Sequence, residues 1–463
     1  MENKNLENIK GKKVLIVGMG KSGIAAVQAM LALGAEVSIQ DAKERNAVDG
    51  QLLNFLEGKQ VHCYFHEVPV AEEKFDMLIL SPGVDPTLPF IREAEAHGAE
   101  IIGELEIAYR IARGTFVAIT GTNGKTTTTT LAGEIFKKSG RKTYVVGNIG
   151  VAVISKAMEA DEDDWLVTET SSFQLETIKY FKPAVSAILN LTPDHLNRHH
   201  TMEAYGEAKK NIFRQQGEAQ VTVLNYDDPI VRTWGAETKG RLCYFSRKEK
   251  LQQGIYMQDG NFIISWDGKQ ETVCNISELH LFGGHNEENV LAAIACGFFA
   301  GVSISDMADV LRNFRSIEHR IEYVATIDGV PYYNDSKATN TDSTIKALEA
   351  FKDGHIILLV GGHDKLTPLE PMMELVKEKT DALILLGAAK ERFNKAAVAC
   401  GVQNIVLADS FEDAVAKAHA LAHKPQVVLL SPACSSFDMF KNYPERGNYF
   451  KKLVHELEGG NVK

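Results

Sequence analysis

The sequence lacks the patterns that place a chain in a membrane or in a secreted, disulfide-bonded protein. Residues 1–10 are polar and charged, and no later apolar run approaches the roughly 18 residues that cross a bilayer. The six cysteines, at positions 63, 243, 274, 296, 400 and 434, include no C-x-x-C pair. We therefore expect a cytoplasmic protein with reduced thiols, without a zinc site or a disulfide framework.

Excess positive charge is absent as well. The formal net charge is −11, which argues against a general binder of nucleic acid or of anionic membranes, although local lysines can still bind phosphate. Hydrophobic residues make up 44% and charged residues 24% of the chain, as in ordinary globular proteins. At 463 residues the chain is too long for one compact core, so we expect about three domains.

The first motif lies near the N-terminus, where a predicted strand over residues 13–17 runs into the glycine-rich loop 18–23. A helix and a second strand follow, and the second strand ends at Asp41, which completes a dinucleotide-binding pattern. The glycines by themselves indicate only that a phosphate can approach the backbone. A further strand over residues 77–80 leads to a loop at Ser81, which we expect at the same edge of a Rossmann-like sheet.

The central motif follows a predicted buried strand over residues 116–119 and precedes a predicted helix. Its glycines let backbone N–H groups surround phosphate oxygens, its lysine can neutralise them, and its hydroxyl can bind Mg²⁺. The strict Walker pattern is not met, because Ile119 stands where that pattern has glycine. The predicted phosphate loop comprises Gly121, Thr122, Asn123, Gly124, Lys125, Thr126 and Thr127.

Two further strand ends carry polar groups that suit phosphoryl transfer. A strand over residues 165–168 ends at Glu169, a candidate Mg²⁺ ligand, and a strand over residues 187–190 leads to a polar loop that contains His195. Residues 241–280 alternate in short segments with Asp-Gly turns, which predicts a small antiparallel insertion.

The last part of the chain again alternates predicted strands with helices. Polar loops follow three of its strands, at residues 334–340, 361–365 and 431–436. Ahead of it, a helix from about residue 287 has Asn286 as a possible N-cap, and residues 314–318 form a predicted linker. Loops at the ends of strands commonly hold small polar ligands, so this part is a candidate substrate domain.

These observations predict an α/β protein of three domains. Residues 1–112 form a Rossmann-like domain, residues 113–316 a central P-loop ATPase-type domain with the antiparallel insertion, and residues 317–463 a second Rossmann-like domain. Three sites for three ligands favour a ligase that joins two molecules at the expense of ATP. Two alternatives remain open, namely an NAD-dependent oxidoreductase, from the first loop and Asp41, and a P-loop switch protein.

The motifs also resemble those of a known family when they are taken in order along the chain. The segments at 121–126, 169–174, 194–195, 284–286, 334–340 and 431–436 are similar to the motifs of the Mur ligases. With the loops at 18–23 and 81–83 they look most like the branch that adds D-glutamate. Another Mur-type ligase or a folate polyglutamate ligase is the nearest alternative, but the latter lacks the first glycine-rich loop.

The resemblance implies a reaction, its substrates and its cofactors. A Mur ligase of this branch activates the alanyl carboxylate of UDP-N-acetylmuramoyl-L-alanine with ATP, and D-glutamate then attacks the acyl phosphate. The products are an amide, ADP and phosphate, in the synthesis of peptidoglycan precursors. Two Mg²⁺ ions, small-molecule substrates only, and a monomer that binds neither nucleic acid nor membrane are implied as well.

Individual roles are implied by motif positions. Lys125, Glu169, His195, Lys209 and Lys365 would act in catalysis, and Thr126, Glu169, His195 and a carbamylated Lys209 would hold the metal ions, with Lys210 as a rival to Lys209. ATP would also contact the phosphate loop, Asn286, Asn289, Arg320 and Asp335. The UDP-substrate would contact Lys21, Ser22, Asp41, Ser81, Asn148 and Gln174, and D-glutamate would contact Thr339, Lys365, Ser436 and Tyr443. The family usually has aspartate in place of Asn197 and phenylalanine in place of Tyr443.

Overall fold

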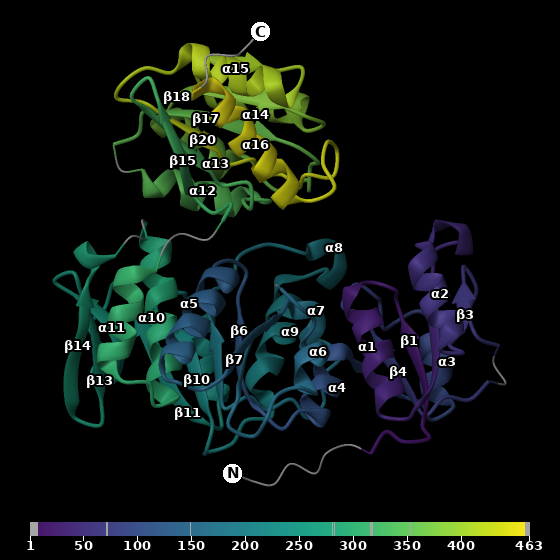
Figure 1. Ribbon diagram of the computed structural model, residues 1–463. Helices are drawn as coiled ribbons and strands as arrows, with labels where there is room; N and C mark the ends of the chain where they lie inside the picture. Colours follow the sequence, from purple (N-terminus) through teal and green to yellow (C-terminus); the bar gives the residue numbers. More distant parts are fainter. Residues whose placement is uncertain are drawn as a thin grey trace. The chain divides into compact units, whose positions relative to one another are not determined.

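The computed structural model describes residues 8–70, 73–148, 150–279, 281, 283–314, 318–351 and 353–458, without the side chains of Asn197 and Glu458. Within these ranges the chain forms three β-sheets with flanking helices (Figure 1). It divides into two compact units, one running to Glu278 and including Glu288–Arg312, the other comprising Leu279–Glu287 and the chain from Asn313. Most of the linker expected at residues 314–318 lies outside the described residues.

The first sheet has five parallel strands in the order β3-β2-β1-β4-β5, which confirms the Rossmann-like N-terminal domain. Because all five strands run the same way, the loops after β1, β2 and β4 meet at one edge of the sheet. The elements of this domain are β1 (Lys13–Val17), α1 (Lys21–Ala32), β2 (Glu36–Asp41), η1 (Arg45–Ala47), α2 (Gly50–Gly58), β3 (His62–Phe65), β4 (Met77–Leu80), α3 (Pro89–Ala96), β5 (Glu100–Gly103) and α4 (Glu104–Ile111).

Strand β1 shows how the apolar sequence is divided between the two faces of this sheet. Val14 and Ile16 pack in the core that includes α1, whereas Leu15 and Val17 pack in a smaller core on the α3 side. Successive side chains of a strand point to opposite faces, so a continuous apolar run is what a strand buried on both faces requires.

The second sheet has nine strands in the order β14-β13-β12-β11-β10-β9-β6-β8-β7, and those from β7 to β12 are parallel. This is the central α/β domain expected from the sequence. Its elements are β6 (Thr115–Thr120), α5 (Lys125–Lys138), β7 (Thr143–Gly147), α6 (Val153–Ala157), β8 (Trp165–Glu169), α7 (Ser172–Leu175), β9 (Val185–Ile188), α8 (Leu196–His199), α9 (Met202–Arg214), β10 (Val221–Asn225), η2 (Val231–Glu237), β11 (Arg241–Ser246), β12 (Gly254–Gln258), β13 (Asn261–Trp266), β14 (Lys269–Asn275), η3 (Ile276–Glu278), α10 (Gly284–Phe299) and α11 (Ile304–Asn313).

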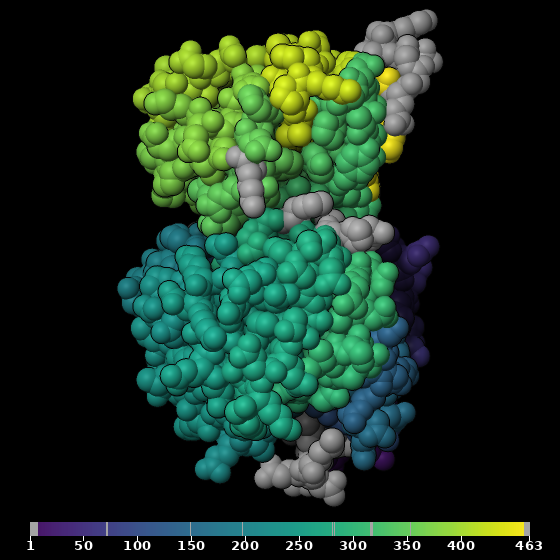
Figure 2. All heavy atoms as spheres, turned by 90° about the vertical axis from the view of Figure 1, so that its left-hand side faces the viewer, coloured from purple at the N-terminus to yellow at the C-terminus, as the bar shows by residue number. Residues whose placement is uncertain are grey.

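The antiparallel part of this sheet is the meander β12-β13-β14, as the Asp-Gly pairs predicted. Asp259 and Gly260 have φ of 50° and 75°, and Asp267 and Gly268 have φ of 50° and 74°, the signs that a two-residue hairpin loop needs. Strand β12 also pairs with β11, so the meander continues the central sheet instead of standing apart from it. It belongs to the teal and green surface in the lower half of Figure 2.

The third sheet has the order β15-β16-β20-β17-β18-β19, parallel except for β15. Helices α12 to α14 contribute to the core on one face, while α15 and α16 pack on the other, giving the second Rossmann-like domain that the sequence predicted. The elements are β15 (Glu322–Ile327), β16 (Val330–Asn334), α12 (Thr341–Ala350), β17 (Ile356–Gly361), α13 (Glu370–Lys379), β18 (Thr380–Leu386), α14 (Lys390–Cys400), β19 (Ile405–Leu407), α15 (Phe411–Leu421), β20 (Val427–Leu430) and α16 (Tyr443–Glu458).

The N-terminal and central sheets share one hydrophobic core, to which α4 contributes Ile107 and Ala108. Two buried carboxylates of α4 reinforce this contact. Glu104 accepts a hydrogen bond from Ile154 N (2.7 Å), at the start of α6, and Glu106 accepts from the backbone N–H groups of residues 179–181. The first two sheets therefore form a single compact unit.

Two expectations from composition can be compared with the described residues. No helix among them combines the length and the apolar character that crossing a bilayer demands. All six cysteines are free thiols, as expected from the absence of paired cysteine motifs. Burial raises the pKa of Cys296 to about 12, so this thiol stays protonated and inert at neutral pH.

Candidate functional site

The glycine-rich loop between β6 and α5 forms a tight turn at the N-terminus of the helix. Gly121 and Gly124 have φ of 155° and 82°, conformations that other residues rarely adopt. A Cβ atom on Gly124 would lie 2.2 Å from Oδ1 of Asn289, so only glycine fits against α10. The first backbone N–H groups of α5 have no partner within a helix, and together with the helix dipole they suit a phosphate.

Two lysines meet at the same carbonyl of this loop. Lys125 Nζ donates hydrogen bonds to the carbonyl oxygens of Gly121 (2.9 Å) and Thr122 (2.8 Å), and Lys209 Nζ donates to that of Gly121 (2.8 Å). Lys209 comes from α9 and is only 1% exposed. Its burial and the charge of Lys125 lower the pKa of Lys209 well below the usual value, although Asp194 and Glu169 oppose the shift. A buried lysine with a lowered pKa can be a neutral amine, the form that reacts with CO₂.

Lys210, the rival to Lys209, is held in a different way. Its Nζ pairs with Glu237 (2.8 Å) and Glu207. Burial acts to lower the pKa of Lys210, but these carboxylates outweigh it and the pKa is raised. Lys210 is therefore a charged, paired lysine, and Lys209 is the better candidate for carbamylation.

Glu169 lies at the end of β8, directly beside the phosphate-loop strand β6. Its side chain is buried, and Oε1 accepts a hydrogen bond from Nδ2 of Asn148 (2.8 Å). Oε2 is also buried and has no hydrogen-bond partner among the described residues. An unsatisfied buried carboxylate oxygen is costly unless a cation or a water meets it, so Glu169 fits the predicted role of Mg²⁺ ligand.

His195 immediately precedes α8 and adopts a left-handed backbone conformation with φ of 54°. Its ring contacts Phe173 at 5.0 Å and Tyr205 at 6.2 Å between centroids, and its side chain is 41% exposed. Nε2 lies 3.6 Å from Oδ2 of Asp194. No group of three or more His, Cys, Asp or Glu side chains among the described residues is placed to hold a metal ion. The predicted metal ligands thus depend on a hydroxyl and a lysine as well, Thr126 and Lys209.

The structure adds two residues that the sequence analysis did not select. Asn190 Oδ1 accepts from the backbone N–H groups of Thr122 (3.0 Å) and Asn123 (2.8 Å), which fixes the phosphate loop. Tyr205 lies under Lys209 Nζ, 4.5 Å from the ring centroid, and its hydroxyl is 3.3 Å from Oγ1 of Thr122. Tyr205 and Lys209 are four residues apart on α9 and so share a helix face. This spacing is the sequence pattern that could have identified Tyr205.

The loops of the N-terminal domain also come together. Ser81 Oγ donates to the carbonyl oxygen of Gly18 (3.1 Å), and Asp41 Oδ2 accepts from the backbone N–H of Met19 (2.6 Å). Lys21 is exposed and Ser22 half-buried at the start of α1. The residues predicted to bind a UDP-substrate thus follow three neighbouring strands, and Asp41 braces the glycine loop.

The two remaining residues predicted for this substrate already have protein partners. Asn148 is exposed and donates to Glu169, which links the substrate loop to the candidate metal site. Gln174 is buried, and its Oε1 accepts from the backbone N–H (2.9 Å) and the hydroxyl (3.0 Å) of Ser171 in a capping box at the start of α7. Ile149, in the same loop as Asn148, lies outside the described residues.

The residues predicted to hold the nucleotide base and ribose lie on α10 and in the second unit. Helix α10 begins at Gly284, so Asn286 is inside its first turn and the N-cap alternative is wrong. Asn289, one turn later, accepts from Oγ1 of Thr128 (3.2 Å). Residue Arg320 precedes β15 in the second unit.

Asp335 follows β16 in that unit and is buried. Oγ of Ser431 donates to its Oδ2 (2.7 Å), and the backbone N–H of Ile321 donates to Oδ1 (3.3 Å). Burial raises the pKa of Asp335 to about 7, against the opposing effects of Ser431 and Arg320.

Three of the predicted D-glutamate residues, Thr339, Lys365 and Ser436, lie on loops at one edge of the third sheet. The backbone N–H of His363 donates to the carbonyl oxygen of Ser435 (2.9 Å), which joins the loops after β17 and β20. Ser436 is buried, Thr339 is half-buried and Lys365 is exposed. Tyr443 begins α16, and its ring centroid lies 5.3 Å from Nζ of Lys337.

Arg446, which the sequence analysis missed, ties two of these loops together. It is 1% exposed, and its guanidinium donates to the carbonyl oxygens of Ser336 (2.7 Å) and Cys434 (3.1 Å) and to Oγ of Ser336 (3.0 Å). Its position on α16, far from both loops in sequence, gave no local signal.

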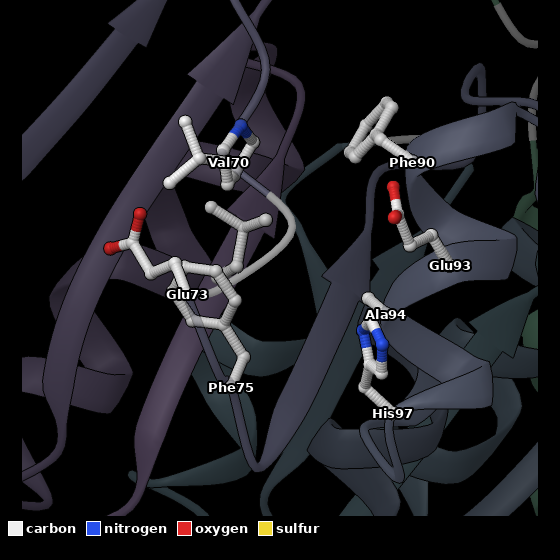
Figure 3. Close-up of a pocket in the computed structure, with 9 residues that line it drawn as sticks. Val70, Glu73, Phe75, Phe90, Glu93, Ala94 and His97 are labelled. Atoms are coloured by element: carbon white, nitrogen blue, oxygen red, sulfur yellow. The ribbon is translucent and has the colours of Figure 1, made fainter.

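Two hollows in the structure stand apart from the predicted residues. A cavity of about 20 Å³ in the N-terminal domain lies between Glu73 and Phe75 on one wall and, on the other, the α3 residues Phe90 and Glu93 with His97 just after the helix (Figure 3). It has room for about one water molecule. An open groove of about 1050 Å³ lies between the start of α15 and α16, and none of the predicted site residues lines it.

Comparison with protein families gives three matches in chain order. Residues 12–103 match the Mur ligase MurD-like N-terminal domain, residues 119–297 the Mur ligase middle domain, and residues 319–434 the Mur ligase glutamate ligase domain. The glycine loop that resembled a dinucleotide site therefore belongs to the first of these domains.

Solved structures support the fold. A pseudomurein peptide ligase type C from Methanothermus fervidus aligns with a TM-score of 0.61 at 19% identity, over 96% of this chain and all of that one. The ligase MurF from Thermotoga maritima, in complex with ADP, aligns with a TM-score of 0.57 at 19% identity, over 85% of this chain and 98% of that one.

Curated relatives match over nearly the full length. The UDP-N-acetylmuramoylalanine--D-glutamate ligase of Thermoanaerobacter sp. (strain X514) is 45% identical over 97% of this chain and 99% of its own length. The protein of the same name from Clostridioides difficile (strain 630) is 43% identical over 97% of this chain and all of its own length. The phosphate loop and its two lysines lie within the middle-domain match, and all three domain matches follow one another in order. Together with the full-length relatives, they show that the chain belongs to the Mur ligase family.

Proposed function

We propose that the protein is an ATP-dependent ligase that adds D-glutamate to UDP-N-acetylmuramoyl-L-alanine, giving ADP and phosphate, in peptidoglycan precursor synthesis. The observation that carries this proposal is the convergence of Lys125, Lys209 and Glu169 around one phosphate loop. The names of the full-length relatives support the choice of substrates.

The chain's own residues have separate roles in the first step. The substrate carboxylate attacks the γ-phosphate of ATP, and two anions must approach each other in line. The ammonium of Lys125 and the N–H groups at the start of α5 neutralise charge that spreads over the transferred phosphoryl group. When bound, two Mg²⁺ ions would supply further positive charge, one held by Thr126 and Glu169 and the other by His195 and carbamylated Lys209.

The second step joins the amino acid. The amine of D-glutamate attacks the carbonyl carbon of the acyl phosphate, the bond to the phosphate oxygen breaks, and phosphate leaves as the amide forms. Lys365 is the residue suited to bind the side-chain carboxylate, with Thr339, Ser436 and Tyr443 around it. Asn286, Asn289, Arg320 and Asp335 would hold the base and ribose of ATP.

Each domain would then supply most of the contacts to one ligand, while Asn148 and Gln174 of the central domain would extend the UDP-substrate site and Arg320 and Asp335 of the third domain would contact ATP. Residues 1–112 would bind the UDP-substrate through Lys21, Ser22, Asp41 and Ser81, with Asn148 and Gln174 extending the site. Residues 113–316 would bind ATP, and residues 317–463 would bind the amino acid. We further propose a cytoplasmic monomer that binds neither nucleic acid nor membrane, because every proposed ligand set comes from this one chain.

Phosphate release from ATP tests the proposal directly. The assay would combine the protein, ATP, Mg²⁺ and UDP-N-acetylmuramoyl-L-alanine with a panel of D- and L-amino acids. Release that requires both the UDP-substrate and D-glutamate, with the condensed product seen by mass spectrometry, is the expected result. No phosphate release with any amino acid, or release that does not depend on the amino acid added, would contradict the proposed function.

A further inference from the structure

The loop after β17 carries Lys365, the proposed partner of the D-glutamate side chain, so a role for this loop in specificity rests on the proposed function. Lysine has a long, flexible side chain, and its ammonium selects a carboxylate well only if the backbone beneath it is fixed. Lys365 itself is exposed. The contacts of its neighbours in the loop show how the backbone there is held.

Arg392, from α14, contacts the loop on both sides of Lys365. Its Nη1 donates to both carboxylate oxygens of Asp364, at 3.0 and 3.1 Å, and its Nη2 donates to the carbonyl oxygen of Thr367 (2.6 Å). The planar guanidinium thus bridges the residue before Lys365 and the second residue after it. A guanidinium that binds two groups through two of its nitrogens is geometrically specific in a way that a single ammonium is not.

The side chain of Asp364 also stabilises the turn that contains Lys365. Its Oδ1 accepts a hydrogen bond from the backbone N–H of Leu366 (2.8 Å), and Leu366 has a φ of 56°. The hydroxyl of Thr341, the first residue of α12, lies 3.4 Å from the hydroxyl of Thr367. The segment around Lys365 is therefore held by a carboxylate, a guanidinium and a hydroxyl, while its outer edge stays open to solvent.

Charge gives Arg392 a second effect. D-Glutamate brings two carboxylates, and an unpaired Asp364 next to Lys365 would repel them and compete for the lysine ammonium. The ion pair with Arg392 neutralises Asp364. We propose that Arg392 is a positioning residue that sets the preference for an acidic amino acid, by fixing the loop of Lys365 and by masking the charge of Asp364.

Steady-state kinetics of Arg392→Ala tests the proposal. We expect the KM for D-glutamate to rise about tenfold, while the KM values for ATP and for the UDP-substrate change by less than about twofold. Arg392→Lys should restore part of the loss, because an ammonium keeps the charge but cannot bridge Asp364 and Thr367 together. Lys395→Ala, which removes an exposed lysine from the same helix, is the matched control and should behave as the parent.

A double-variant cycle shows whether Arg392 acts through Lys365. In a Lys365→Ala background, Arg392→Ala should lower kcat/KM for D-glutamate clearly less than it does in the parent, since the group that it positions is gone and only the repulsion by the unmasked Asp364 remains. Equal effects in both backgrounds would overturn the proposal, as would an unchanged KM for D-glutamate or a parallel rise in all three KM values. If the parent protein shows no D-glutamate-dependent phosphate release, the proposed function fails instead, which separates the two outcomes.

Discussion

The phosphate loop of the central domain and the loops of the third domain differ in how they are prepared for a ligand. In the central domain, Lys125 and Lys209 are hydrogen-bonded to the loop itself, and Glu169 and Lys209 are buried. In the third domain the buried polar groups, Asp335 and Arg446, bind other loops, whereas Lys365 is exposed.

This difference matches the chemistry that each region would serve. Phosphoryl transfer is accelerated by charges that are already in place, so a preorganised loop that holds the Lys125 ammonium is an advantage. An amino acid must enter and bind through its own charges, so a site with a solvent-exposed lysine on a braced loop is sufficient. The central site is thus built from the proposed catalytic groups themselves, and the third-domain site from supports beneath the proposed binding groups.

The largest expected effect is at the phosphate loop. Lys125→Ala should lower turnover by at least about 10³-fold, because it removes a charge aimed at the transferred phosphoryl group. The melting temperature should stay close to that of the parent. Lys137→Ala, on the exposed face of the same helix, is the control for loss of a lysine. Near-normal phosphate release by Lys125→Ala would remove the loop from the mechanism.

The buried lysine comes next. Stripping bicarbonate should lower activity by about 10- to 100-fold, and adding it back should restore activity, because a carbamate on Lys209 would act as a metal ligand. Lys209→Arg should be inactive with or without bicarbonate, while Lys210→Ala should keep most of its activity. Activity that is indifferent to bicarbonate would argue against the carbamate.

In the third domain the expected loss is in stability. Arg446→Met should lower the free energy of unfolding of the second unit by about 3 kcal/mol, since the carbonyl groups of Ser336 and Cys434 would lose their donor. Urea unfolding measures this, and Lys452→Met on the exposed face of the same helix serves as control. An unchanged midpoint would show that the loops hold together without Arg446.

The smallest effect, counted per pH unit, concerns one buried carboxyl group from each unit. Burial raises the pKa of Glu104, despite hydrogen bonds from Ile154 and Val153, and that of Asp335, in both cases to about 7. A carboxyl group with a raised folded-state pKa stabilises the fold below its ordinary pKa and loses that contribution as pH rises to about 7. The slope for each group is at most about 1.4 kcal/mol per pH unit.

Glu104→Gln and Asp335→Asn should each flatten the pH dependence of unfolding between about pH 4 and 7, by this linkage, in their own unit. Chemical unfolding at several pH values, followed by probes in each unit, measures the slopes. A slope that neither substitution changes would mean that other groups dominate the pH dependence of stability.

Much of the fold followed from local sequence. The apolar run before the phosphate loop, the glycine loop after β1 and the Asp-Gly turns of the meander were identified because each depends on neighbours in the chain. The start of α10 was misplaced, since Asn286 is a good N-cap residue by type but the helix begins two residues earlier. The supports at Asn190, Arg392 and Arg446 were not found, because they have partners that are distant in sequence. Tyr205 was also missed, although its four-residue spacing from Lys209 was a local signal.

The sequence by itself determined the order of the motifs, the three α/β domains and the resemblance to a family of ligases, since residue type and spacing are sufficient for these. Only the tertiary structure distinguished the surroundings of Lys209 from those of Lys210, because burial and neighbouring charges shift the pKa values of these adjacent lysines in opposite directions. It likewise showed which side chains brace the loops, for a hydrogen bond depends on where the folded chain brings donor and acceptor together.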